Sequence, residues 1–277
     1  MGTFPKVDGR APIHVFASSK SWIEGNATHQ LQQVADLVGV TAVAAMPDLH
    51  PGKYGPVGCA ILADRIHPQL VGSDIGCGMG LFQLDIPARK LRLDRLAERL
   101  HTLDQPWEGD IGDAVAKAGL AESAFDAALG SIGGGNHFCE FQAIQEIVDA
   151  DAAADAGLQP DSAFVLVHSG SRGLGFSILE RVLMNGQATL DPASDAGRAY
   201  MADHDQAVHW AQLNRRVIAE RAAVAAHAEL RPVNDLAHNM VETQGLADGG
   251  ITLLHRKGAA ASDRGLVPVP GSRGTLS

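Results

Sequence analysis

The chain has 277 residues, 45% of them hydrophobic and 19% charged, which is typical of a globular protein with a substantial core. Its net charge of −10 argues against nucleic-acid binding through a broad basic surface, so any such contact must be local or mediated by bound cations. No apolar run reaches the roughly 18 residues of a membrane span. The N-terminal MGTFPKVDGR lacks the apolar core of a secretion signal, so we predict a cytoplasmic protein.

Helical and strand patterns follow one another without a regular βαβ repeat. The first helix is predicted to have Asn26 as its N-cap and to end before Gly39. This pattern favours an α+β fold, or a mixed sheet with irregular connections. We predict helices over 27–38, 91–101 and 196–229, strands over 40–46, 57–63, 80–86, 164–168 and 251–255, and surface helix or loop over 104–128 and 149–157.

The glycines gather in short clusters at the predicted strand ends, notably over 72–80 and 130–135. A strand delivers a side chain to a fixed point, and a glycine turn after it lets backbone approach a ligand closely. In VGSDIGCGMG, over 71–80, such a turn carries Asp74 and Cys77 three residues apart. A carboxylate and a thiolate at this spacing can point at one spot, so both are candidate metal ligands.

The chain has three cysteines, and an odd number without a secretion signal argues against a disulfide framework. We expect Cys59, in VGCAIL, to be a buried small hydrophobic residue. Cys77 differs from it because it stands in a glycine-rich turn beside a carboxylate.

Three of the 12 histidines also stand out: His137 and His168 are beside loops rich in Gly, Ser or Asn, and His238 is in LAHNMVE, after the long predicted helix. Each alone is more often a satisfied core histidine than a ligand. With Asp74 and Cys77 they form a set too large for one tetrahedral zinc, but suited to two metals that share a bridging thiolate. Ligand chemistry alone would favour zinc, and the spacing leaves the metal open. Others, among them His67 and His204, are expected on the surface or on helix faces.

Phosphate-binding groups occur near these ligands. Glycine–serine loops with a cation suit a phosphate, although each alone is also an ordinary turn with a solvated charge. The three loops are HSGSRG, with Ser169, Ser171 and Arg172; HRKGA, with Arg256 and Lys257; and PGSRGTLS, with Ser272, Arg273 and Ser277.

Together, eight segments resemble the RtcB-type RNA ligase family, in the family's order and over nearly the whole chain. They are MPDLHPGKYGPVG (46–58), VGSDIGCGMG (71–80), GGGNHFCE (133–140), VHSGSRGLG (167–175), WAQLNR (210–215), HNMVE (238–242), HRKGA (255–259) and PGSRGTLS (270–277). The resemblance implies one RtcB-like ligase domain over 1–277, with mixed sheets flanked by helices and a site built from glycine-rich loops at strand ends.

The family joins an RNA 3′-phosphate or 2′,3′-cyclic phosphate end to a 5′-hydroxyl end, in tRNA splicing or RNA repair, with GTP and two Mn²⁺ ions. The resemblance implies that Asp74, Cys77 and His137 hold one manganese, and that Cys77, His168 and His238 hold the other. It further implies that Asn136 and Asn239 contact the GTP phosphates, and that Glu140, beside Phe138, binds the guanine. Arg172 would contact an RNA phosphate. A further loop would contact the nucleotide through Pro270, Gly271, Ser272, Arg273 and Ser277.

The sequence departs from the family at a C-terminal histidine motif, at a C-terminal lysine that contacts the guanine in the family, and at minor positions such as Arg273, where a methionine is common. In the family, a histidine C-terminal to PGSRG attacks GTP and becomes covalently guanylylated, whereas this sequence ends at Ser277. We therefore assign no catalytic residue within 1–277 and expect a C-terminally truncated, divergent member that cannot guanylylate itself. Two other interpretations stay open, a metal-dependent phosphoesterase on the same scaffold and a non-catalytic nucleotide- or RNA-binding remnant.

Overall fold

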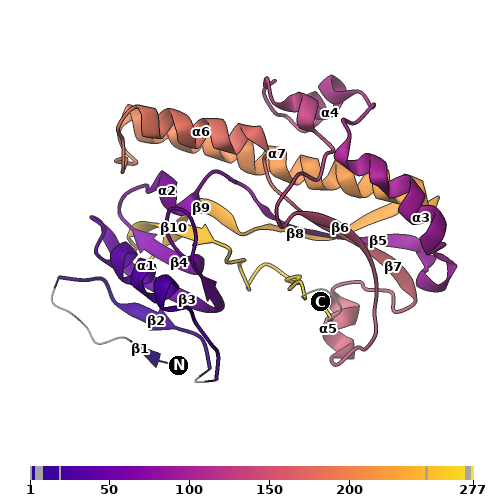
Figure 1. Cartoon of the computed structure of the whole chain (residues 1–277), viewed down its shortest axis with the longest axis horizontal. Coiled ribbons are helices and arrows are strands. Elements are labelled where there is room, and N and C mark those ends of the chain that lie inside the picture. The colour runs from indigo at the N-terminus through magenta and orange to yellow at the C-terminus, as the bar shows by residue number, and fades with distance from the viewer. Residues whose placement is uncertain (1, 4–8, 19, 247–248, 272–275) are drawn as a thin grey trace. The chain divides into compact units, whose positions relative to one another are not determined.

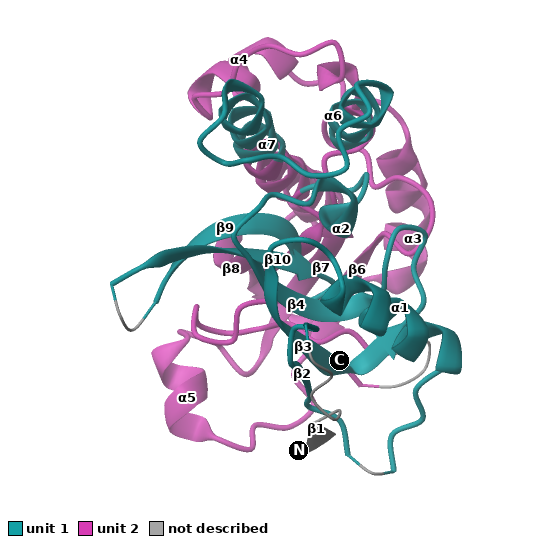
Figure 2. Ribbon diagram, turned by 90° about the vertical axis from the view of Figure 1, so that its left-hand side faces the viewer, with its two compact units in different colours: residues 1–75, 175–207, 238–259 teal, residues 76–174, 208–237, 260–277 magenta. Residues whose placement is uncertain are grey.

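The computed structural model describes residues 2–3, 9–18, 20–246, 249–271 and 276–277. The chain forms two compact units, each with its own sheet (Figure 2). Unit 1 comprises residues 1–75, 175–207 and 238–259, and unit 2 comprises 76–174, 208–237 and 260–277. The chain passes between the units at five places, among them directly before Gly76 and directly after Ala237. One ligase domain over 1–277 stays a prediction.

Unit 1 is built on a six-stranded sheet in the order β1-β2-β3-β4-β10-β9 (Figure 1). The β2–β3 pair is parallel and the other pairs are antiparallel, so the sheet is mixed. Helix α1 packs Leu31 and Val34 into one core cluster with Val43 and Ile61 of the sheet. The strands are β1 (Gly2–Thr3), β2 (Ile13–Val15), β3 (Val40–His50), β4 (Val57–Ala63), β9 (Asn239–Gly245) and β10 (Ile251–Lys257), with helices α1 (Gly25–Ala35) and α2 (Pro68–Val71).

Unit 2 is built on a four-stranded antiparallel sheet in the order β6-β7-β5-β8. Ile218 and Ala222 of the long helix α7 (Asp195–Ala226) pack in one core cluster with Phe82 and Val165 of this sheet. The strands are β5 (Gly78–Pro87), β6 (Phe138–Ala143), β7 (Ser162–Ser169) and β8 (Leu230–Ala237). The helices are α3 (Leu93–Leu100), α4 (Ile111–Lys117) and α5 (Ala150–Asp155), with 3-10 turns over Ala88–Lys90, His101–Asp104 and Asp126–Ala128, and α6 (Gly173–Met184) begins in this unit.

The predicted α+β class is confirmed, and the strand over 57–63 has the predicted bounds. The cap of the first helix was predicted wrongly. That helix begins at Gly25 after Glu24, so Asn26 lies inside it, and it ends at Ala35 with Asp36 as its C-cap. Among the described residues, no helix is both long and apolar enough to cross a membrane.

Candidate metal centre

The antiparallel sheet of unit 2 gathers three of the predicted ligands at one end. Strand β5 starts directly after Cys77, β6 starts directly after His137, and β7 carries His168 as its penultimate residue. In the register, Gly78 pairs with Ser169, and Phe138 pairs with His168. Because antiparallel neighbours run in opposite directions, the starts of β5 and β6 lie beside the end of β7.

At this end of the sheet, the side chains of Cys77, His137 and His168 converge. The Cys77 sulfur lies 3.2 Å from Nε2 of His168 and 3.4 Å from Nε2 of His137. The two imidazole rings meet edge to face, with centroids 5.2 Å apart. Cys77 and His168 are buried and His137 is half-buried. One thiol and two imidazoles this close offer the donor atoms from which proteins build transition-metal sites.

The orientation of His168 suits a metal ligand. Its Nδ1 lies 3.0 Å from the backbone carbonyl oxygen of Asn136, and a carbonyl oxygen can only accept a hydrogen bond. Nδ1 therefore carries the proton, and Nε2 presents its lone pair on the side of Cys77. Metal-binding histidines are commonly fixed in this way, by a carbonyl on the nitrogen that faces away from the ion. The ring of Phe138 packs against His168 at 5.5 Å between centroids.

The other two predicted ligands, Asp74 and His238, belong to unit 1. Within that unit, the amide of Asn239 donates to the backbone carbonyl of Asp74 at 3.3 Å, so the segments that carry the two residues lie side by side. The same amide accepts from the backbone N–H of Gly258 at 2.8 Å. Asn239 therefore has a structural role in tying these segments together, and its phosphate contact stays a prediction.

Two of the predicted nucleotide residues line one cavity of unit 2. Glu140 and Ser277 are in the wall of a cavity of about 540 Å³, together with Gln142 and Phe164. Glu140 is exposed, and its carboxylate accepts from the amide of Gln142 at 3.4 Å. Asn136 is exposed in the loop before β6, and the backbone N–H of Gly271 donates to the Ser277 hydroxyl at 3.1 Å. Pro270 is exposed, whereas Ser272 and Arg273 lie outside the described residues.

Arg172 lies in the short loop between β7 and α6, four residues after His168. Its backbone has a φ of 55°, in the left-handed region that costs energy for a residue with a side chain. Its guanidinium lies against Gly133, where an added Cβ would approach within 1.5 Å of Nη1. Because Gly133 has no side chain, the guanidinium of Arg172 can occupy this space.

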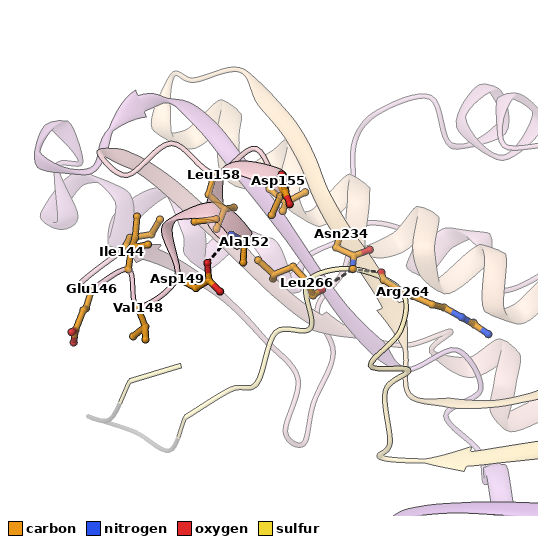
Figure 3. A pocket seen from close by; sticks show the side chains of 15 residues that line it. Ile144, Glu146, Val148, Asp149, Ala152, Asp155, Leu158, Asn234, Arg264 and Leu266 are labelled. Carbon is orange, nitrogen blue, oxygen red and sulfur yellow. Dashed lines mark hydrogen bonds between the residues drawn. The ribbon is translucent and has the colours of Figure 1, made fainter.

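A second cavity of unit 2, of about 760 Å³, lies between the segment around α5 and the residues 233–234 and 264–266 (Figure 3). The amide of Asn234 donates to the carbonyl oxygens of Arg264 and Leu266, at 3.0 and 2.6 Å, and holds that wall in place. Among the described residues that line this cavity, none is a predicted ligand or nucleotide contact.

Two histidines of unit 1 that were predicted on the surface or on helix faces are buried. His67 and His204 are 2% and 0% exposed. His204 lies on helix α7, in agreement with the second alternative, whereas a surface position for His67 is wrong. Nε2 of His204 accepts from the backbone N–H of Val241 at 2.9 Å, and Nε2 of His67 lies 3.1 Å from the carbonyl oxygen of Val38. Both contacts join distant parts of the chain, which no local pattern around these histidines indicates.

The chain is similar to known RNA ligases. The family described as tRNA-splicing ligase RtcB matches residues 30–108 and 107–277. The RNA-splicing ligase RtcB2 of Escherichia coli is 45% identical over 267 residues, which cover 96% of this chain and 70% of that protein. The RNA-splicing ligase RtcB of Mycobacterium tuberculosis is 30% identical over 309 residues, with 84% of this chain and 71% of that protein covered. The tRNA-splicing ligase RtcB of Thermococcus kodakarensis is 26% identical over 370 residues, with 99% and 77% covered.

Proposed function

Because the chain belongs to the RtcB family of RNA ligases, we propose that it joins RNA 3′-phosphate or 2′,3′-cyclic phosphate ends to 5′-hydroxyl ends, with GTP and two Mn²⁺ ions. The family membership makes the chain an RNA ligase. The end chemistry, the cofactors and the RNA are the proposed part. Spliced tRNA or broken RNA is the proposed substrate, in the cytoplasm.

The observation that carries this proposal is the convergence of Cys77, His137 and His168 in unit 2. The chain itself restricts where Asp74 and His238 can lie. Asp74 is three residues before Cys77, and His238 follows Ala237, which pairs with Gly78. Since successive Cα atoms are about 3.8 Å apart and paired ones about 5 Å, the Cα atoms of Cys77 and His238 are within about 13 Å.

We assign Asp74, Cys77 and His137 to one cation, and Cys77, His168 and His238 to the other, with the thiolate shared. The thiolate and imidazoles suit transition metals, and the carboxylate suits a hard ion such as Mn²⁺. When bound, two such cations supply positive charge against the negative charge of phosphate groups. This local charge is consistent with an RNA enzyme whose net charge is −10.

The residues of the chain would hold the two substrates around these cations. Asn136 and Asn239 would contact the GTP phosphates, and Glu140, with Phe138 next to the ligands, would bind the guanine. The nucleotide loop at Pro270, Gly271, Ser272, Arg273 and Ser277 would close on the same nucleotide, which is supported by the cavity shared by Glu140 and Ser277. Arg172 would hold an RNA phosphate through its guanidinium, which can donate two parallel hydrogen bonds.

The test is a sealing assay with two RNA strands, one ending in a 3′-phosphate and the other beginning with a 5′-hydroxyl. The assay protein carries residues 1–277 together with the family's guanylylated-histidine motif C-terminal to PGSRG. It should give joined RNA only when both GTP and Mn²⁺ are present, and none with Cys77→Ala. Strands with a 3′-hydroxyl and a 5′-phosphate serve as the matched control and should stay separate. Release of the 3′-phosphate without joining, at the same rate with and without GTP, would contradict the proposal and favour a phosphoesterase.

A further inference from the structure

The motif WAQLNR, over 210–215, carries a buried polar cluster on helix α7. Arg215 is completely buried, and its Nε lies 3.0 Å from both carboxylate oxygens of Asp235 on strand β8. A buried guanidinium needs partners for all of its donors, because a charge taken out of water without them is very costly. The partners of its other N–H groups show which backbone segments Arg215 holds in position.

Nη1 of Arg215 donates to two backbone carbonyl oxygens, those of Gly76 and Ser169, at 2.7 Å each. Gly76 directly precedes Cys77, and Ser169 directly follows His168. One nitrogen therefore joins the backbone next to the thiol to the backbone next to the imidazole. The distance of 3.2 Å between the Cys77 sulfur and Nε2 of His168 depends on these two backbone segments keeping their positions.

The neighbouring Asn214 holds the segment that leads to the third ligand. Its carbonyl oxygen accepts from the backbone N–H of Gly130 at 2.7 Å. Its amide donates to the Ser131 carbonyl oxygen at 3.3 Å and to the Ser169 hydroxyl at 3.1 Å. Residues 130–131 start the glycine loop that ends at His137, so Asn214 ties this loop to the strand end that carries His168.

We propose that Asn214 and Arg215 are positioning residues of the metal centre, which set the spacing of Cys77, His137 and His168 through the backbone next to them. This inference rests on the proposed function, because it requires that these three side chains bind metal. The hydrogen bonds of Asn214 and Arg215 reach the backbone next to the ligands, the Ser169 hydroxyl and Asp235, and not the three ligand side chains themselves. Removing a residue that orients metal ligands without binding the metal typically weakens the metal affinity 10- to 100-fold.

Trp210, one turn earlier on the same helix, provides a matched control. It is also completely buried, and its indole N–H donates to the carboxylate of Asp126 at 2.8 Å. Asp126 lies in the 3-10 turn over Asp126–Ala128, which does not carry a ligand. Trp210→Phe therefore removes a buried hydrogen bond from α7 without releasing the backbone next to Cys77 or His168.

The experiment is a Co²⁺ titration of the metal-free full chain, since cobalt bound to a thiolate gives a charge-transfer absorption band. The variants are Arg215→Lys, Asn214→Ala and Trp210→Phe, each also measured for its thermal unfolding midpoint. Lysine keeps the positive charge beside Asp235 but lacks the planar guanidinium, which donates to the Asp235 carboxylate and to both backbone carbonyls at once. We expect 10- to 100-fold weaker Co²⁺ binding and a weaker thiolate band in Arg215→Lys and Asn214→Ala. Trp210→Phe should bind Co²⁺ within about twofold of wild type, although it is also destabilised.

Three results would overturn the proposal. If Arg215→Lys and Asn214→Ala bind Co²⁺ like wild type, positioning is wrong while the metal site stands. If Trp210→Phe loses as much affinity as they do, the loss reflects general destabilisation. If wild type shows no thiolate band, the metal site itself is wrong and the positioning role falls with it. Should Arg215→Lys fail to fold, Arg215→Met/Asp235→Leu removes both buried charges together, and unchanged affinity in that variant would be decisive against positioning.

Discussion

At the scale of single residues, the two buried cysteines Cys59 and Cys77 have different surroundings. Burial raises the pKa of the Cys59 thiol to about 12, so at neutral pH this thiol keeps its proton and is a poor ligand. Cys77 instead lies beside the Nε2 atoms of two histidines. We expect wild type loaded with Mn²⁺ to carry two metals per chain, Cys59→Ala the same number, and Cys77→Ala fewer than one. Elemental analysis measures this, and equal metal content in Cys77→Ala would mean that Cys77 is not a bridging ligand.

Glu140 offers a second prediction at this scale. A carboxylate can accept two N–H bonds from the guanine edge, which adenine does not present, so Glu140→Gln should reduce the preference for GTP over ATP. The carboxylate is exposed without nucleotide, so we expect a loss near the lower end for such bonds, about 1 kcal/mol or fivefold. Calorimetric binding of both nucleotides checks it. Glu146→Gln, an exposed carboxylate in the wall of the same cavity, should keep the preference, and an unchanged preference in Glu140→Gln would remove Glu140 from this role.

At the scale of elements, the start of β5 depends on a glycine. A Cβ on Gly78 would lie 2.3 Å from the carbonyl oxygen of Leu236 and 2.6 Å from the Cα of Ala237, both backbone atoms of β8. Gly78→Ala should therefore push β8 away and destabilise the chain by about 1–3 kcal/mol. Urea unfolding of the metal-free chain measures this. Gly134→Ala, where an added Cβ meets no atom within 4 Å, is the control and should unfold like wild type. Equal stability of the two variants would contradict the close β5–β8 approach.

The elements also show what the sequence could indicate. The apolar runs VGCAILA and FVLVH predict buried strands, and both are strands of the sheets. Strand β8, LRPVNDLA, was missed because it contains a proline and three polar residues; its Asp235 pairs with the buried Arg215. The predicted ligands Cys77, His137 and His168 stand out beside glycine loops. Arg215 does not, because an arginine in a helical pattern normally indicates a solvated face, and only the tertiary structure buries it.

At the scale of the whole molecule, buried histidines of unit 1 link stability to pH. Burial, with the nearby His67, lowers the pKa of His255 to about 3, and burial also lowers the pKa of His67. The rings of His67 and His255 lie 5.7 Å apart, and Nε2 of His255 accepts from the His67 backbone N–H at 2.9 Å. Protonation of His255 would break this bond and charge a buried ring.

Because the unfolded chain binds a proton at His255 below about pH 6.5 and the folded chain binds one only near pH 3, this contribution to folding is complete above pH 6.5 and is lost as the pH falls toward 3. The loss approaches about 1.4 kcal/mol per pH unit for His255, and the lowered pKa of His67 acts in the same direction. We expect His255→Gln to show a flatter pH dependence of the unfolding free energy between pH 6.5 and 4.5, measured by urea unfolding without metal. His14→Gln, at an exposed position of the same sheet, should keep the wild-type slope. A wild-type slope in His255→Gln would contradict the prediction.

The charge of the whole chain leads to a prediction about RNA. With 22 Lys and Arg against 32 Asp and Glu, the chain repels a polyanion overall, so binding must come from local cations and a few arginines. We expect RNA affinity to fall at least tenfold when Mn²⁺ is chelated. With Mn²⁺ present, the affinity should depend only weakly on monovalent salt, because few side chains replace counterions.

Arg172→Gln should weaken binding of every RNA sequence tested and reduce the slope of log affinity against log salt by about one. Arg216→Gln, an exposed arginine of α7 that pairs with Glu220, is the matched control and should change neither. Filter binding across salt concentrations, with and without chelator, measures both effects. RNA binding that survives chelation with a steep salt slope would instead require a basic surface, and would contradict this account of the charge.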